Sequence, residues 1–233
     1  SRLFRLTAMH LHDRFATFLS ASEIIEATPA LLNDQRRRFT SSPDIVLQPN
    51  SVESVQKIMR FCFENRIRVT PQGGNTGLCG ATVTTEGVLL NLSKLNRIRD
   101  INLADNSMTV EAGVILQNAQ KAADKAGRLF PLSLASEGSC QIGGNIACNA
   151  GGLNVLRYGS MRDLVLGLEV VLPNGELVSH LQPLHKNTTG YDLRHLFIGS
   201  EGTLGIITAA TLKLFAQPKT KATAWVGLDD IES

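Results

Sequence analysis

The sequence has few aromatic residues and almost no net charge. Phe, Trp and Tyr make up 5% of the 233 residues, and 23 Lys and Arg against 21 Asp and Glu leave a formal net charge of +2. So small a net charge gives no field that would attract nucleic acid or an anionic membrane surface. The scarcity of aromatic side chains also argues against a platform for stacked bases. We therefore expect no nucleic-acid partner.

Metal-ligand patterns and long apolar runs are missing as well. The four cysteines, Cys62, Cys79, Cys140 and Cys148, include no C-x-x-C pair, and the five histidines include no H-x-x-x-H pair. Such spacings bring ligands together on a metal, so we expect no metal site. No uncharged apolar stretch is long enough to predict a membrane span, and no signal-like segment opens the chain. The expected compartment is therefore the cytoplasm.

Three common active-site fingerprints are also missing from the sequence. There is no G-x-x-x-x-G-K-[ST] phosphate loop and no strict G-x-G-x-x-G dinucleotide motif. There is no G-x-S-x-G nucleophile elbow either, because Glu137 precedes Ser139 by two residues and Ile198 precedes Ser200 by two. The sequence thus has no motif that predicts a mononucleotide P-loop, a Rossmann nicotinamide site or a serine hydrolase.

Glycine, in contrast, is plentiful and clustered. Paired glycines occur at 73–74 in the segment "PQGGNTG" (71–77) and at 143–144 and 151–152 in "SEGSCQIGGNIACNAGG" (136–152), and a third segment, "GYDLRHLFIGSEGTLGIIT" (190–208), has four single glycines. A single glycine-rich segment is most often only a turn. Because glycine costs roughly 0.5–1 kcal/mol in regular structure, three clusters favour a surface shaped for a large ligand. Consecutive exposed N–H groups bind anions, so a pyrophosphate is the expected occupant, and Gly74 is expected to leave room for it.

The order of the predicted elements indicates two different halves. Residues 12–28 and 51–66 have helical periodicity, and 45–47, 67–70 and 87–92 are predicted strands, which gives β-α-β-loop-β over residues 43–92. Further along, residues 116–130 are a predicted helix, and 164–178 are two strands joined by Asn174–Gly175, a strong hairpin signal. We expect an N-terminal helical segment at 1–42, one lobe at 43–95 and a second at 96–220. At 221–233 we expect the start of another domain, with a strand at Ala224–Leu228 and a helix beginning at Asp229–Asp230.

The three glycine segments, in this order and at these separations, resemble the flavin-binding half of the vanillyl-alcohol-oxidase-type (PCMH-type) FAD family. Within that family they are most similar to the D-2-hydroxyacid dehydrogenase branch, whose members oxidise D-lactate, glycolate or D-2-hydroxyglutarate. The resemblance runs from Pro43 to Pro218. It implies a two-lobed α+β fold, in which a small α/β lobe faces a larger lobe with a mixed or antiparallel sheet and helices.

The resemblance also implies which residues bind FAD. The pyrophosphate would lie on Pro71, Gln72, Gly73, Gly74, Asn75, Thr76 and Gly77. The ribityl chain and isoalloxazine ring would lie against Pro131, Ser133, Leu134, Gly138, Ser139, Gly143, Gly144, Asn145 and Ala147. The adenine side would be reached by Gly202, Ile206 and Ile207. Many relatives attach the flavin through a histidine directly after the loop glycines; this chain has Asn75 and Thr76 there, so noncovalent FAD is expected.

The implied activity is oxidation of a D-2-hydroxy acid to the 2-oxo acid by hydride transfer to flavin N5, with an unidentified electron acceptor. Such a reaction needs a base and a cationic clamp for the carboxylate. In the family these come from a second half that follows the flavin half, so we expect no catalytic residue in this chain and no turnover by the chain alone. Two alternatives remain open: an FAD-binding module without turnover of its own, and a relative of the enolpyruvyl reductases, which use a nicotinamide reductant.

Overall fold

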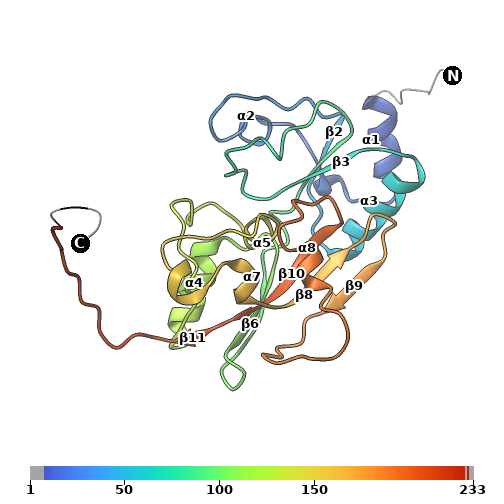
Figure 1. The fold of residues 1–233 in the computed structure, drawn as a ribbon. Coiled ribbons are helices and arrows are strands. Elements are labelled where there is room, and N and C mark those ends of the chain that lie inside the picture. Colours follow the sequence, from blue (N-terminus) through green and yellow to red (C-terminus); the bar gives the residue numbers. More distant parts are fainter. Residues whose placement is uncertain (1–7, 229, 231–233) are drawn as a thin grey trace.

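Two large β-sheets organise the chain, one near the top of Figure 1 and one near its centre. The structure is a computed structural model that describes residues 8–228 and 230, with side chains described from residue 11 onward. The first sheet has the strand order β1-β2-β4-β3 and the second the order β5-β6-β10-β8-β9. Because each sheet has its own strands, the predicted two-lobed α+β architecture is confirmed.

The first lobe is a small mixed sheet with one long helix beside it. Its elements are β1 (Ile24–Ile25), β2 (Ile45–Leu47), α3 (Val52–Glu64), β3 (Val69–Gln72) and β4 (Val88–Asn91). Strands β2 and β3 run parallel to β4, whereas β1 pairs antiparallel with β2. As expected from the sequence, Ser51 caps α3, because its Oγ accepts a hydrogen bond from the N–H of Ser54 at 3.1 Å. The glycine loop follows the carboxyl end of β3, where the β-α-β-loop-β pattern predicted it.

The N-terminal segment is not the single helix predicted for residues 12–28. Helix α1 (Ala8–Ala16) is followed by the short turn η1 (Ala21–Glu23) and by β1, and α2 (Pro29–Leu32) comes next. The buried carboxylate of Glu23 accepts hydrogen bonds from the N–H of Ser20 at 3.0 Å and from the N–H of Asn50 at 3.1 Å. This polar turn follows the end of α1 and redirects the chain, and the β-branched pair Ile24–Ile25 then joins the edge of the first sheet.

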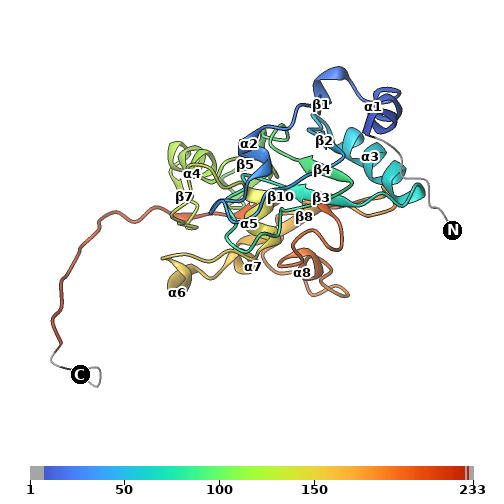
Figure 2. The same cartoon turned by 90° about the horizontal axis from the view of Figure 1, so that it is seen from above.

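The second lobe is an antiparallel sheet with short helices packed on one face (Figure 2). Its strands are β5 (Ile98–Asn102), β6 (Ser107–Glu111), β8 (Val165–Val171), β9 (Leu177–His180) and β10 (Ile206–Lys213). Its helices are α4 (Leu116–Lys125), α5 (Ile142–Ala147), α6 (Val155–Tyr158), α7 (Met161–Leu164) and α8 (Arg194–Phe197), and the short strands β7 (Arg128–Leu129) and β11 (Phe215–Ala216) pair separately. The predicted Asn174–Gly175 hairpin joins β8 to β9, with Gly175 at φ 84°.

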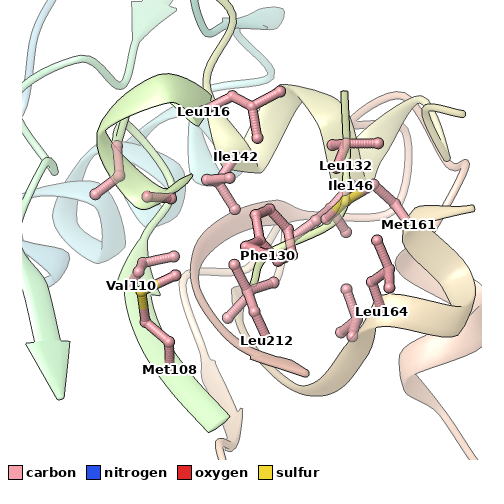
Figure 3. Close-up of a cluster of buried hydrophobic side chains, with 14 of the residues drawn as sticks. Met108, Val110, Leu116, Phe130, Leu132, Ile142, Ile146, Met161, Leu164 and Leu212 are labelled. Atoms are coloured by element: carbon pink, nitrogen blue, oxygen red, sulfur yellow. The ribbon is translucent and has the colours of Figure 1, made fainter. Parts of the chain in front are cut away.

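The core of this lobe lies between the sheet and helices α4, α5 and α7, as Figure 3 shows. Met108 and Val110 from β6 and Leu212 from β10 meet Ile142 and Ile146 from α5, and all five side chains are fully buried. Burying such a side chain stabilises the fold by about 1.5–3 kcal/mol. The packing fixes α5, and with it the second glycine cluster, against the sheet.

The helix predicted for 116–130 is confirmed over Leu116–Lys125 but ends five residues early, because Gly127 adopts φ 67°, a left-handed conformation that terminates helices. The strand predicted for 224–228 is wrong. Residues 224–228 form no strand: they have no regular structure and lead away from the sheets (Figure 1), and Trp225 is 99% exposed. Of the predicted helix start, Asp229 lies outside the described residues.

The two lobes touch where the β8–β9 turn meets α3. Gln56 Nε2 donates to the carbonyl of Gly175 at 3.1 Å, and a Cβ on Gly175 would lie 2.7 Å from the Gln56 carbonyl oxygen. Val171 and Ile206 of the second sheet belong to the core cluster of the first lobe. These contacts hold the two lobes in one relative position.

An ionic cluster braces the start of the second sheet. Arg97 donates from Nη2 to Glu111 at 2.8 Å, and Arg99 makes a two-pronged contact with Glu169 at 3.0 and 3.1 Å. Thr208 Oγ1 donates to Glu169 at 2.9 Å. The Glu111 side chain is only 1% exposed. Burial alone would raise the pKa of Glu111, but the hydrogen bonds and charge of Arg97 outweigh it, so the pKa lies below its ordinary value.

Candidate functional site

A cavity opens between the two lobes, and most of its walls are glycine, alanine and aliphatic side chains. Nine residues predicted to bind FAD line it: Pro71, Gln72, Gly73, Gly143, Gly144, Ala147, Gly202, Ile206 and Ile207. They come from β3, α5 and the segment leading into β10, which are far apart in the sequence. The fold thus brings all three glycine segments to one cavity with an apolar lining, which suits a flat aromatic ring.

The loop 73–77 presents a row of free backbone donors beside this cavity. Within the described residues, none of the N–H groups of this loop donates a hydrogen bond to the protein. Asn75 adopts φ 52°, a left-handed conformation that few side chains other than Asn and Asp tolerate. Consecutive unpaired N–H groups with a left-handed residue among them form an anion-binding concavity. A pyrophosphate therefore fits this loop, since its oxygens only accept hydrogen bonds at neutral pH.

The loop is braced by the segment around α2. Asn75 Nδ2 donates to the carbonyls of Asn33 at 2.6 Å and Ala30 at 3.1 Å, and its Oδ1 accepts from Thr82 Oγ1 at 2.9 Å. The buried Gln72 donates from Nε2 to the carbonyl of Leu31 at 2.9 Å. The side chains of Gln72 and Asn75 thus shape the loop. Sequence reasoning did not foresee this role of residues 30–33, because the partners lie about 40 positions away.

The glycines of the site serve two different purposes. A Cβ on Gly74 would lie 2.1 Å from the carbonyl oxygen of Ser139, whereas a Cβ on Gly144 would meet nothing within 4 Å. Gly74 is therefore required for packing between the first and second glycine segments, and the expectation that its missing side chain leaves room for a ligand is wrong. Gly144 lines the cavity and faces open space. Its missing Cβ is the one that leaves room for a ligand.

Several of the predicted FAD-binding residues do not line this cavity. They are Gly74, Asn75, Thr76, Gly77, Pro131, Ser133, Leu134, Gly138, Ser139 and Asn145. Asn145 is buried and donates from Nδ2 to Cys140 Sγ at 3.5 Å, so its side chain belongs to the packing around α5. Gly138 and Ser139 are exposed in the turn that precedes α5. The backbone of Thr76 and Gly77 carries two of the free N–H groups described above.

The structure adds cavity residues that were not predicted to contact FAD: Ala81, Thr82, Leu92, Ala112, Cys148 and Glu201. Gly205, which lies within the predicted segment 202–207, lines the cavity too. Glu201 adopts φ 50°, an uncommon conformation for a glutamate and one that often marks functional sites. Burial, the carboxylate of Glu201 and the nearby Cys79 raise the pKa of Cys148, so its thiol stays protonated at neutral pH. The only feature of the sequence that could have indicated Glu201 as a site residue is its position in the glycine-rich stretch "GSEGTLG".

The cavity is poor in groups for acid–base chemistry and for binding carboxylates. Among its described lining residues only Cys148 and Glu201 can ionise, and there is no Lys, Arg or His. The described part of the chain also contains no group of three or more His, Cys, Asp and Glu placed to hold a metal. A substrate carboxylate would therefore meet no cation on these walls. No described helix is long and apolar enough to cross a bilayer.

A second cavity, larger than the interlobe cavity, lies under the loop 182–194, against β8 and β9. Its one arginine, Arg194, already donates to the carbonyls of Val165 at 2.8 Å and Leu166 at 2.7 Å. Asp192 also pairs with Arg194 at 2.8 Å. This second cavity lacks the free N–H row and the paired glycines of the interlobe cavity. The interlobe cavity is therefore the better candidate for a cofactor site, although it is smaller.

Comparison with known proteins agrees with this geometry. Residues 43–180 match the family model described as FAD binding domain. The chain is 40% identical over 225 residues to the D-2-hydroxyglutarate–pyruvate transhydrogenase of Saccharomyces cerevisiae, covering 94% of this chain and 45% of that protein. It is 48% identical over 186 residues to the D-2-hydroxyglutarate dehydrogenase of Xanthomonas citri pv. viticola, covering 79% of this chain and 39% of the relative. The chain thus spans less than half the length of these relatives.

Solved structures show the same fold at low sequence identity. An alkyldihydroxyacetonephosphate synthase superposes with a TM-score of 0.79 at 21% identity, over 91% of this chain and 44% of that one. The 6-hydroxy-D-nicotine oxidase of Arthrobacter nicotinovorans gives a TM-score of 0.73 at 21% identity, over 84% of this chain and 43% of that one. Given the family match over residues 43–180 and a cavity that joins its three glycine segments, the chain belongs to the FAD binding domain family, and its cofactor is FAD.

Proposed function

We propose that this chain is the FAD-binding portion of a flavin-dependent dehydrogenase that oxidises a D-2-hydroxy acid to the 2-oxo acid. The observation that carries the proposal is the 40–48% identity to proteins named for D-2-hydroxyglutarate over 79–94% of this chain. D-2-hydroxyglutarate is accordingly the first substrate to test. D-lactate follows, because a putative D-lactate dehydrogenase of Schizosaccharomyces pombe is 39% identical over 201 residues.

The residues of this chain would bind and orient the cofactor. The N–H groups of 73–77 would hold the pyrophosphate, and the apolar walls around Gly144, Ala147 and Ile207 would exclude water from the flavin. FAD supplies the hydride acceptor. Because no Lys, Arg or His lines the described cavity, the base for the substrate hydroxyl and the clamp for its carboxylate would come from other residues of the active protein.

The test is anaerobic mixing of the FAD-loaded chain with D-2-hydroxyglutarate, D-lactate and glycolate in turn, while flavin absorbance is followed. We expect stable flavin binding and no bleaching by the chain alone. In the longer protein that contains this chain, the D enantiomer of one hydroxy acid should bleach the flavin absorbance and the L enantiomer should not. If no hydroxy acid reduces the longer protein, the proposed substrate class is wrong. Rapid bleaching of the chain alone would place base and clamp within its 233 residues.

Compartment and electron acceptor are proposals too. A cytoplasmic location stays the proposal from the sequence, although several relatives, such as the D-2-hydroxyglutarate dehydrogenase of Danio rerio, are named mitochondrial. Cell fractionation followed by immunodetection of the native protein would test it.

The electron acceptor would be identified by reoxidation of the reduced protein with candidate acceptors.

A further inference from the structure

The side chain of Gln141 is buried beside the cavity without a hydrogen-bond partner. Gln141 is 7% exposed, and its Oε1 accepts no hydrogen bond within the described residues. The point where a Cβ on Gly73 would sit lies 3.4 Å from this oxygen and 3.8 Å from the N of Gly144. Gly73 and Gly144 both line the cavity. The unpaired acceptor thus lies where the first and second glycine segments meet.

An unpaired buried acceptor is unfavourable for the protein on its own. Native buried polar groups nearly always have partners, because an unsatisfied one bears the full cost of its lost hydration. A leucine at this position, beside a cavity whose walls are largely apolar, would avoid that cost. We infer that the Gln141 amide accepts a hydrogen bond from a ligand, and its position beside the cavity makes the cofactor that ligand.

The chemistry of an acceptor restricts which part of FAD it can contact. The pyrophosphate has no hydrogen to donate at neutral pH, so it cannot satisfy Oε1. The nearest donors to a pyrophosphate held on residues 73–77 are the hydroxyls of the sugar groups on either side of it, ribityl and ribose. We propose that Gln141 is a positioning residue that accepts a hydrogen bond from one of these hydroxyls. This inference rests on the placement of FAD in the interlobe cavity made under the proposed function.

The test compares Gln141→Leu and Gln141→Glu with wild type. The matched control is Gln117→Leu, because Gln117 lies on α4 and does not line the cavity. Two quantities are measured: the FAD dissociation constant, by flavin fluorescence, and the melting temperature without FAD. We expect Gln141→Leu to weaken FAD binding about tenfold, as for the loss of one hydrogen bond. Its melting temperature without FAD should equal or exceed that of wild type, because the unpaired acceptor is gone.

Gln141→Glu distinguishes a hydroxyl contact from a phosphate contact. A rotated amide would place Nε2 at this position and donate to a phosphate oxygen, and side-chain amide orientation follows from the partner. A carboxyl group still accepts from a hydroxyl, so Gln141→Glu should bind FAD within about threefold of wild type on our proposal. If Gln141→Glu binds FAD more weakly than Gln141→Leu does, the contact is with phosphate and the proposal is wrong.

Binding of ADP identifies which sugar is held, since ADP has the ribose and pyrophosphate but no ribityl chain. Unchanged ADP affinity in Gln141→Leu assigns the contact to the ribityl chain; an equal loss for ADP and FAD, with Gln141→Glu tolerated, assigns it to the ribose. Both results support the proposal. Unchanged FAD affinity in Gln141→Leu, or a lowered melting temperature without FAD, overturns it while leaving the cofactor site intact. Failure of the wild-type chain to bind FAD would overturn the placement of the cofactor as well.

Discussion

Substitutions at Gly144 and Gly74 test two different roles of glycine. Gly144 leaves space in the cavity for FAD, whereas Gly74 leaves space for the neighbouring backbone of Ser139. Gly144 lies inside α5, and a Cβ there would meet nothing within 4 Å. Alanine is more favourable than glycine inside a helix by about 0.5–1 kcal/mol, so Gly144→Ala should raise the melting temperature by roughly 1–4 °C. Gly144→Val fills the cavity further, and we expect it to weaken FAD binding at least tenfold, about 1.4 kcal/mol.

Gly74 should behave in the opposite way. Its Cβ would lie 2.1 Å from the Ser139 carbonyl oxygen and 3.1 Å from the Cα of Cys140, and both are backbone atoms that cannot turn aside. Such overpacking costs roughly 1–3 kcal/mol or more. Gly74→Ala should therefore lower the melting temperature of the chain without FAD, and any loss of flavin would follow from that.

The assay measures the melting temperature without FAD and the FAD dissociation constant for wild type, Gly144→Ala, Gly144→Val and Gly74→Ala. The expected result is a stable Gly144→Val that binds FAD poorly and a destabilised Gly74→Ala. FAD binding by Gly144→Val with wild-type affinity would refute the assignment of the cofactor to this cavity. A Gly74→Ala variant as stable as wild type would refute the packing argument.

Three further predictions concern attachment, acid stability and thiol reactivity. Acid precipitation should release all flavin into the supernatant, because Asn75 and Thr76, and no histidine, directly follow the loop glycines; colour in the pellet would contradict this. The pKa of Glu111 lies below its ordinary value of 4.5, so its stabilising contribution is present above that pH and is lost as pH falls through the lower folded pKa. Glu111→Gln should therefore lower the melting temperature at pH 7 and flatten its decline below pH 4.5, whereas parallel pH profiles would refute the role of Arg97 as its partner. Burial raises the pKa of Cys62 to about 12, so a disulfide reagent at pH 8 should label the exposed Cys79 and leave Cys62 unlabelled in the folded chain.

Local signals in the sequence determined the elements and the chemistry of the loops. The Ser51 cap, the period of α3, the Asn174–Gly175 hairpin and the free glycine loop after β3 each depend on residues close together in the chain. Such features follow from backbone and rotamer preferences that act over a few residues. The N-terminal segment was harder to predict, because its helical period continues into Ile24–Ile25, and only the partner strand β2 makes those residues a strand.

The roles of individual site residues depended on the tertiary structure. Which glycine faces a ligand and which faces another segment is decided by contacts between residues 65 positions apart, as for Gly74 and Ser139. The same holds for Asn75, whose side-chain amide donates to the carbonyls of Ala30 and Asn33. It also holds for Gln141, because only the folded structure shows that its Oε1 is buried without a hydrogen-bond partner. Sequence by itself thus predicted a glycine-rich backbone suited to a pyrophosphate, and the resemblance of its glycine segments to a known family predicted FAD. Only the packing of the two lobes decided which side chains shape that site, because contact, burial and the lack of a partner are properties of atoms brought together from distant parts of the chain.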